Sequence, residues 1–458
     1  MSMIKISPVD NVAVNSETGH KTALCDIKAG DKVIKYGFCI GIATEDIKAG
    51  DSVHTHNIKT ALSVRSEYEY HPKECALKPL APDTVEAYVR EDGGVGVRND
   101  IWIIPTVGCI NGTARRLAEL TGAIALTHPY GCSQLGGDHA TTQKILCGLV
   151  NHPNAGGVLV LGLGCENNNL GEFKKVLGGV NPDRVKFLNA QDFDDEIAEG
   201  LRLIAELKNY ASGFKRQSVP VSKLKIGLKC GGSDGFSGIT ANPAIGRLAD
   251  RVIAMGGACV LTEVPEMFGA ETILMDRCES KDVFDKTVSL INNFKDYFVA
   301  HNQVIYENPS PGNKAGGIST LEEKSLGCTQ KGGSSPVTDV LDYGDTVTKP
   351  GLNLLNGPGN DMVAVTNLTA CGCQIILFST GRGTPLGAPV PTVKVATNSS
   401  IASKKSGWID FNTGEIINGR DIDDDFFEYV KRVANGELTC SERNGYREIA
   451  IFKDGVTL

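Results

Sequence analysis

The chain has 458 residues, too many for one ordinary hydrophobic core, so two to four domains are expected. A net charge of -8 with no basic stripe argues against nucleic-acid binding. No apolar run approaches the length of a membrane span, and the first residues, MSMIKISPVDN, lack an apolar signal region. We therefore expect a cytoplasmic protein without nucleic-acid or membrane partners.

Cysteine is frequent, with 14 residues. For a cytoplasmic chain these residues indicate buried thiols, reactive thiols or metal ligands rather than disulfides. The sequence contains no CxxC pair, which argues against a zinc ribbon.

Residues 1–70 are predicted to form a small β-rich domain. The hexapeptide DIKAGD occurs at 26–31 and again at 46–51, and short strands with glycine turns at this spacing suggest a compact barrel or clip. The segment after the second copy is VHTHN. On a strand, His54 and His56 would point to the same face, where they could bind a metal or a carboxylate. The alternative is a surface pair without a function.

Residues 71–87 contain three prolines and little periodicity, which is typical of a linker. Residues 88–218 then alternate apolar strands with helices, a pattern that predicts a parallel sheet covered by helices. The polar segment 216–223 is interpreted as a boundary.

The last predicted domain, residues 219–458, begins with the strand KIGLKC, a glycine-rich turn containing Asp234, and a helix over about 244–254. In open α/β sheets, ligands bind beyond the carboxyl ends of the strands. The chain is predicted to end in an acidic helix and a short strand, EIAIFK. The predicted fold class is therefore α/β: a small N-terminal β-clip domain followed by two α/β domains with mostly parallel sheets.

Polar and thiol side chains recur at predicted strand ends. Each buried cysteine alone is more simply explained by packing, but the repeated position suggests a site for a soft-to-borderline metal such as Fe(II). Lys314 in a turn-rich loop and Arg382 after a strand would suit a small anionic substrate. The strand-end residues are Cys109, His128, Cys132, Cys165, Glu166, Cys230, Asp234, Glu263, Glu266 and Arg382.

Dinucleotide-binding, Walker, GxSxG and HExxH motifs are absent. The strings VHTHN, VRNDIWIIPTVGCIN, THPYGC, LGLGCENN, LKCGGSDGFSGITANPA, NPSPGNKAGG and STGRGTP instead resemble the altronate/galactarate dehydratase family over nearly the whole chain. The resemblance implies an N-terminal SAF (β-clip) domain and a metal-dependent hydro-lyase that acts on sugar acids. VHTHN is more similar to the altronate branch, which implies D-altronate as substrate and 2-dehydro-3-deoxy-D-gluconate as product.

The predicted roles follow from this resemblance and from side-chain chemistry. Cys328, Cys371 and Cys373 lie outside the family pattern and are not favoured as ligands. A base would remove the C2 proton while the metal or an acid assists loss of the C3 hydroxyl. We predict metal ligands among His54, His56, Cys132 and Cys230, catalytic roles for His54, His128 and Lys314, and substrate contacts from Asp234, Asn313, Arg382 and Thr384.

Several alternatives remain open at this level. The metal could be Mn(II) or Mg(II) rather than Fe(II), or an iron–sulfur cluster on three cysteines, although no compact cluster spacing supports the last. The substrate could be galactarate or sulfolactate. The chain could also bind a sugar acid without chemistry, or use its thiols only for packing. A homo-oligomer is possible.

Overall fold

The computed structural model describes residues 2–63, 67–75 and 77–458. The N-terminal domain is built from short antiparallel strands in two small sheets, with orders β1-β2-β3-β6 and β4-β5-β7. No helix in the described residues is long and apolar enough to cross a membrane. The strands are β1 (Met3–Ile4), β2 (Val12–Asn15), β3 (Lys21–Ala23), β4 (Lys32–Lys35), β5 (Phe38–Ala43), β6 (Ser52–Val53) and β7 (Ile58–Lys59).

The two copies of DIKAGD pair with each other in this domain. Ile27 and Ile47 form a reciprocal bridge. Lys28 bonds Asp46 at 2.8 Å, and the equivalent Lys48 bonds Asp26 at 2.9 Å. Each copy of the hexapeptide therefore makes the same contacts to the other copy, which explains why the sequence is repeated.

The second region contains a four-stranded parallel sheet with the order β11-β10-β12-β13. Helices α1 and α4 contribute Leu117 and Leu207 to the core on one face of this sheet, and α2 contributes Leu146 to the core on the other. The elements are β10 (Asp100–Pro105), α1 (Asn111–Thr121), β11 (Ile124–Ala125), α2 (Gly136–Val150), β12 (Ala155–Gly162), α3 (Leu170–Leu177), β13 (Val185–Asn189) and α4 (Glu196–Ser212).

A small antiparallel sheet, β14-β8-β9, connects this region to the next. Strand β8 (Thr84–Val89) begins inside the segment expected to be a linker, and β14 (Arg216–Pro220) occupies the expected polar boundary. Strand β9 (Val95–Gly96) completes the sheet. The two segments pair with each other from positions about 130 residues apart, and this long-range pairing could not be read from either segment alone.

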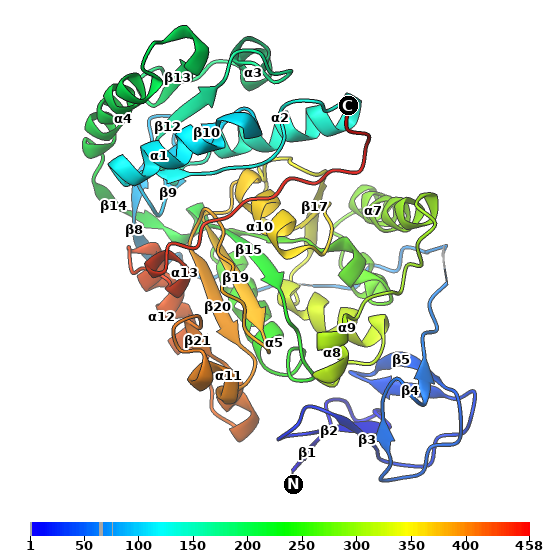
Figure 1. Cartoon of the computed structure of the whole chain (residues 1–458). Coiled ribbons are helices and arrows are strands. Elements are labelled where there is room, and N and C mark those ends of the chain that lie inside the picture. Colours follow the sequence, from blue (N-terminus) through cyan, green and yellow to red (C-terminus); the bar gives the residue numbers. More distant parts are fainter. Residues whose placement is uncertain (1, 64–66, 76) are drawn as a thin grey trace.

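The third region is organised around a seven-stranded parallel sheet, shown in the middle of Figure 1. Its order is β17-β18-β16-β15-β19-β20-β21, so β15 lies at the centre. Because all paired strands are parallel, their carboxyl ends share one edge. The strands are β15 (Lys225–Cys230), β16 (Ala258–Leu261), β17 (Val337–Leu341), β18 (Gly351–Leu355), β19 (Ile375–Thr380), β20 (Thr392–Ala396) and β21 (Phe411–Asn412).

Helices cover both faces of this sheet. Ile226 and Leu228 share a core with α5, α7 and α12. On the other face, Phe378 shares a core with α10 and α2, so both α/β regions contribute to one apolar cluster. The helices are α5 (Ala241–Ala254), α6 (Glu271–Met275), α7 (Lys281–Ala300), α8 (Pro311–Ala315), α9 (Leu321–Cys328), α10 (Asp361–Ala370), α11 (Ser399–Lys404), α12 (Asp423–Ala434) and α13 (Cys440–Arg443).

The predicted strand EIAIFK near the C-terminus is wrong. Ile449 and Ile451 are buried, but the segment pairs with no strand of the described residues. Its backbone bonds the Gly387 carbonyl through Glu448 N–H and otherwise bonds side chains. Ala450 N–H donates to Thr366 Oγ1 and Phe452 N–H donates to the Tyr343 hydroxyl, each at 3.0 Å.

Candidate active site

Thiols and carboxylates gather at the carboxyl edge of the seven-stranded sheet. Cys230 is the last residue of β15, and Glu263 follows β16. Glu263 has a left-handed backbone with φ of 71°, an unfavourable conformation for a side chain of this size. Cys328 ends the neighbouring helix α9, and Lys331 lies in the 3₁₀ turn that follows it.

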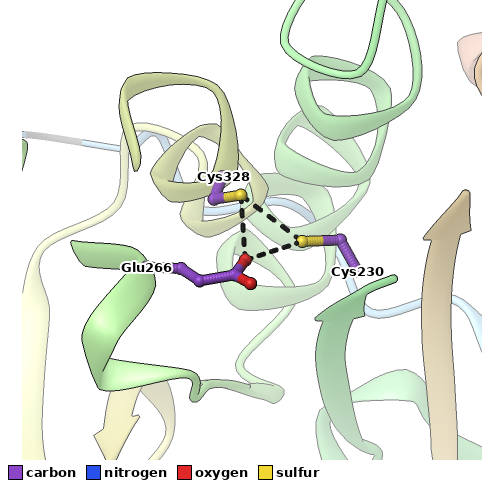
Figure 2. Close-up of side chains that lie close together, drawn as sticks. All are labelled: Cys230, Glu266 and Cys328. Carbon is purple, nitrogen blue, oxygen red and sulfur yellow. Dashed lines mark hydrogen bonds between the residues drawn. The ribbon is translucent and has the colours of Figure 1, made fainter. Parts of the chain in front are cut away.

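The side chains of Cys230, Cys328 and Glu266, which lies in the 3₁₀ turn after β16, converge on one point, as Figure 2 shows. The thiols of Cys230 and Cys328 both lie within hydrogen-bonding distance of Glu266 Oε2, at 3.2 and 3.1 Å. The two sulfur atoms are 3.4 Å apart. We call Cys230, Glu266 and Cys328 the triad; all three are buried.

Three buried lysines surround the triad. Lys331 Nζ lies 2.9 Å from Cys230 Sγ and 3.3 Å from Glu263 Oε2. Lys324 Nζ donates to Glu266 Oε1 at 2.7 Å. Lys229 binds both Glu263 and Asp361. Three ammonium groups therefore face the three carboxylates of Glu263, Glu266 and Asp361, which balances the charge of the cluster.

This balance controls the protonation of the triad. Burial alone would raise the pKa of Glu266, but the charges of Lys324, Lys229 and Lys331 outweigh it and hold that pKa well below its usual range. The hydrogen bond from Cys230, together with burial, raises the pKa of Cys328 well above its ordinary value. Cys328 is therefore a neutral thiol at pH 7 in the absence of a metal.

The N-terminal domain contacts the same side of the molecule. His54 Nε2 lies 2.9 Å from the backbone oxygen of Lys314 in α8, and its Nδ1 lies 3.0 Å from Thr55 Oγ1. Burial lowers the pKa of His54 below its usual value. Buried Lys21 and Lys35 both bind Glu323 of α9 at 2.8 Å, which fixes the domain in place.

Two cations remain free beside this contact. Lys314 is half-buried and Arg382 is exposed, and neither side chain bonds any other residue that the structure describes. The Arg382 side chain lies against α8, since a Cβ added at Gly312 would be 3.7 Å from its Nε. Together they form an accessible cationic surface suited to a carboxylate.

A small cavity lies between the N-terminal domain, the turn after β15 and helix α9. Its volume is about 10 Å³, enough for one water molecule, and its walls include Asp234, Lys324 and Cys328. A much larger cleft of about 790 Å³ lies between α7 and the loops after β17 and β18, and it contains none of the predicted site residues.

Family models match along most of the chain. They are described as the altronate/galactarate dehydratase SAF domain (residues 15–61), the D-galactarate dehydratase/altronate hydrolase second domain (87–212) and the D-galactarate/altronate dehydratase C-terminal domain (221–457). The chain belongs to this family. The match also confirms the predicted fold class, with a SAF domain at the N-terminus.

Relatives within the altronate/galactarate dehydratase family are similar over nearly their full length. Altronate dehydratase of Escherichia coli is 53% identical over all of both chains. Altronate dehydratase of Bacillus subtilis is 56% identical over 96% of this chain and 92% of its own. Galactarate dehydratase (L-threo-forming) of E. coli is 30% identical over 95% and 89%.

The structure brings together only part of the predicted site. His54 contacts the Lys314 backbone of α8, and Arg382 lies against the same helix at Gly312. Residues 54–57 form a turn, not the expected strand, so His56 does not share a face with His54 and is exposed. Cys132 lies exposed at the edge of the other parallel sheet. Among the predicted metal ligands, only Cys230 belongs to the triad.

Three further predicted residues are occupied by internal hydrogen bonds. His128 is buried, with Nε2 at 2.8 Å from Pro105 O and Nδ1 accepting from Tyr130 N–H, and burial lowers its pKa to about 4. Asp234 accepts bonds from Thr397, Asn398 and Ser237. Asn313 Nδ2 donates to Ser233 O at 2.9 Å, and its Oδ1 caps α8.

Thr384 is half-buried, and its Oγ1 accepts a bond from Leu386 N–H at 3.3 Å. Sequence reasoning missed Cys328 and the three lysines of the cluster. Glu263 and Glu266 carried a usable signal, since both follow a predicted strand. The lysines carried none, because a lysine in a strand or helix is ordinarily a surface residue.

Proposed function

We propose that this protein is a hydro-lyase that removes water from D-altronate to give 2-dehydro-3-deoxy-D-gluconate. The observation that carries the proposal is the likeness to two altronate dehydratases, at 53% and 56% identity, over nearly the whole chain. Two cations at helix α8 support it, because a sugar acid presents a carboxylate: Lys314, which adjoins His54 of the SAF domain, and Arg382, which lies against Gly312. Galactarate is a second candidate, since a galactarate dehydratase is 30% identical.

His54 is the base in this proposal. If its Nε2–H donates to the Lys314 carbonyl, Nδ1 is unprotonated and accepts from the Thr55 hydroxyl. The lowered pKa keeps the ring neutral at pH 7, so it can take the C2 proton of a substrate whose carboxylate is held by Lys314 and Arg382. His128 is not retained as a proton carrier, because it is buried and both ring nitrogens bond backbone groups. Among the described residues, His54 Nδ1 in contrast bonds only the exposed Thr55 hydroxyl, which a substrate can displace.

The triad fits a divalent metal, and we propose Fe(II). Two thiols and one carboxylate favour a borderline ion over Mg(II) or Mn(II). Metal–sulfur bonds of about 2.3 Å place tetrahedral sulfurs about 3.8 Å apart, so the sulfurs, now 3.4 Å apart, would need to separate only slightly. Bound there, the ion would supply Lewis-acid stabilisation of negative charge.

The location and assembly of the protein are also proposals. All 14 cysteines are free thiols, which supports the cytoplasmic location expected from composition. A homo-oligomer stays a prediction.

A substrate panel tests the function. Protein handled anaerobically with Fe(II) is given D-altronate, galactarate or sulfolactate, and 2-keto-3-deoxy acid is measured. We expect product from D-altronate alone. Binding of D-altronate without product would identify a sugar-acid-binding protein instead, and product only from another acid would move the assignment to that acid.

Two variants separate binding from chemistry. Arg382→Met should raise KM about 10- to 100-fold, the range for one lost charge-assisted bond. His54→Gln should lower kcat by about 100-fold or more, as for a lost general base. The control is Lys175→Met, a 70% exposed lysine in the second region, which should leave both constants unchanged. Normal turnover by the His54 variant would refute its role.

A further inference from the structure

Three exposed cysteines lie at the carboxyl edge of the second region's sheet. Cys109 follows β10, Cys132 follows β11 and Cys165 follows β12, and these are neighbouring strands in the order β11-β10-β12. Because the strands are parallel, all three turns leave the sheet at the same edge. All three thiols are free and exposed.

The three turns that carry these cysteines are bonded to one another. Gly108 N–H donates to Tyr130 O at 2.8 Å, which connects the first turn to the second. Asn168 N–H donates to Gly131 O at 2.9 Å, which connects the second to the third. A Cβ at Gly131 would lie 1.9 Å from Thr106 O, so only glycine permits this approach. The turns preceding Cys109 and Cys132 are therefore in backbone contact.

The surroundings of these thiols differ from those of the triad. No lysine, arginine or carboxylate of the described residues bonds any of them; the recorded partners are Gln191 Nε2 at 3.8 Å from Cys165 and Ser133 Oγ at 4.0 Å from Cys132. Cysteine is ordinarily among the most buried residue types. Three unpaired, exposed thiols at one sheet edge therefore need an explanation other than packing.

A single metal ion does not explain them. Among the described residues, the triad is the one group of three potential ligands whose ligand atoms all lie within 4.8 Å of one another. A cubane cluster places its thiolates on separate irons, so it accepts ligands that are more widely spaced. Thiolates are also the usual ligands of such clusters.

We propose that Cys109, Cys132 and Cys165 bind a [4Fe–4S] cluster. Each thiol loses its proton to solvent and ligates one iron, and the fourth iron has no cysteine ligand and stays open to an oxygen donor. The cluster is built from ferrous iron, ferric iron and sulfide, so ligation itself transfers no electrons to or from the protein. This inference is independent of the proposed substrate.

The test measures iron, acid-labile sulfide and visible absorbance on the full chain, purified without oxygen and reconstituted with iron and sulfide. We expect about four sulfides per chain and a broad visible absorption band. Cys109→Ser, Cys132→Ser and Cys165→Ser should each lose most of both signals. Cys25→Ser, at an exposed thiol of the N-terminal domain, is the matched control and should keep them.

The triad provides a second control. Cys328→Ser should lower iron bound without sulfide and leave the sulfide content unchanged, so failure of the proposed Fe(II) site and failure of the cluster are distinguishable. Urea unfolding of the metal-free variants shows whether they are folded. Three results would overturn the proposal. They are wild-type protein that contains no sulfide, zinc bound at these thiols in place of iron, and full retention of sulfide by all three folded variants.

Discussion

The two parallel sheets present their carboxyl edges in different ways. At the seven-stranded sheet, Cys230 is buried among three lysines and three carboxylates in a charge-balanced cluster. At the four-stranded sheet, Cys109, Cys132 and Cys165 are exposed, and no charged side chain in the described part of the chain bonds them. The same residue type at the same topological position is therefore part of a buried ionic network in one region and open to a ligand in the other.

The largest expected effect comes from carboxylates that follow equivalent strands. Glu263→Ala would leave Lys229 and Lys331 buried with one partner fewer each, and we expect a loss of about 3–5 kcal/mol in the free energy of unfolding. Glu166→Ala at the other edge removes bonds from the Thr106 hydroxyl and from the backbone N–H groups of Leu163 and Gly164, none of them charged, and we expect a loss of about 1–3 kcal/mol. Urea unfolding measures both. Equal losses would mean that the ionic network adds no more to stability than the uncharged hydrogen bonds of Glu166.

The sequence predicted the arrangement of strands and helices better than it predicted the buried ionic network around Cys230. Alternating apolar strands and helices correctly predicted both parallel sheets, since central strands such as β12 and β19 are buried on both faces and read as continuous apolar runs. The position of Cys230 at a strand end followed from the same pattern. Cys328 did not, because α9 is buried on all sides and its polar residues find partners only in the folded chain. Long-range pairing, as between Lys21 and Glu323, leaves no local signal.

The next expected effect concerns the pH dependence of stability. It involves Glu323, which lies in the same helix, α9, as Cys328. Burial would raise the pKa of Glu323, but Lys21 and Lys35 outweigh it and hold the pKa well below its usual range. The folded chain therefore binds this proton less readily than the unfolded chain. The stability contributed by Glu323 is present above about pH 4.5 and declines as pH falls below that value, by up to about 1.4 kcal/mol per pH unit.

Glu323→Gln removes this titration. Unfolding free energies measured from pH 7 to pH 3 should fall less steeply for the variant than for the wild type, although the variant is less stable at pH 7. Glu172→Gln, which breaks an exposed ion pair with Lys175 in the second region, is the control and should keep the wild-type slope. Identical slopes for Glu323→Gln and wild type would show that the pair does not control acid stability.

The smallest expected effect is the difference in unfolding free energy between a buried and an exposed cysteine variant, both measured in metal-free protein. Cys328→Ser changes a buried group that contacts Glu266 and Cys230, and we expect a loss of about 1–2 kcal/mol. Cys165→Ser changes an exposed group whose one recorded side-chain contact is Gln191, so its effect should stay within about 0.5 kcal/mol. Alkylation gives a second measure: Cys165 should react in the folded chain, whereas Cys328, buried and with a raised pKa, should react only after unfolding. A destabilising Cys165→Ser would mean that the exposed edge, too, is held by its thiols rather than open to a ligand.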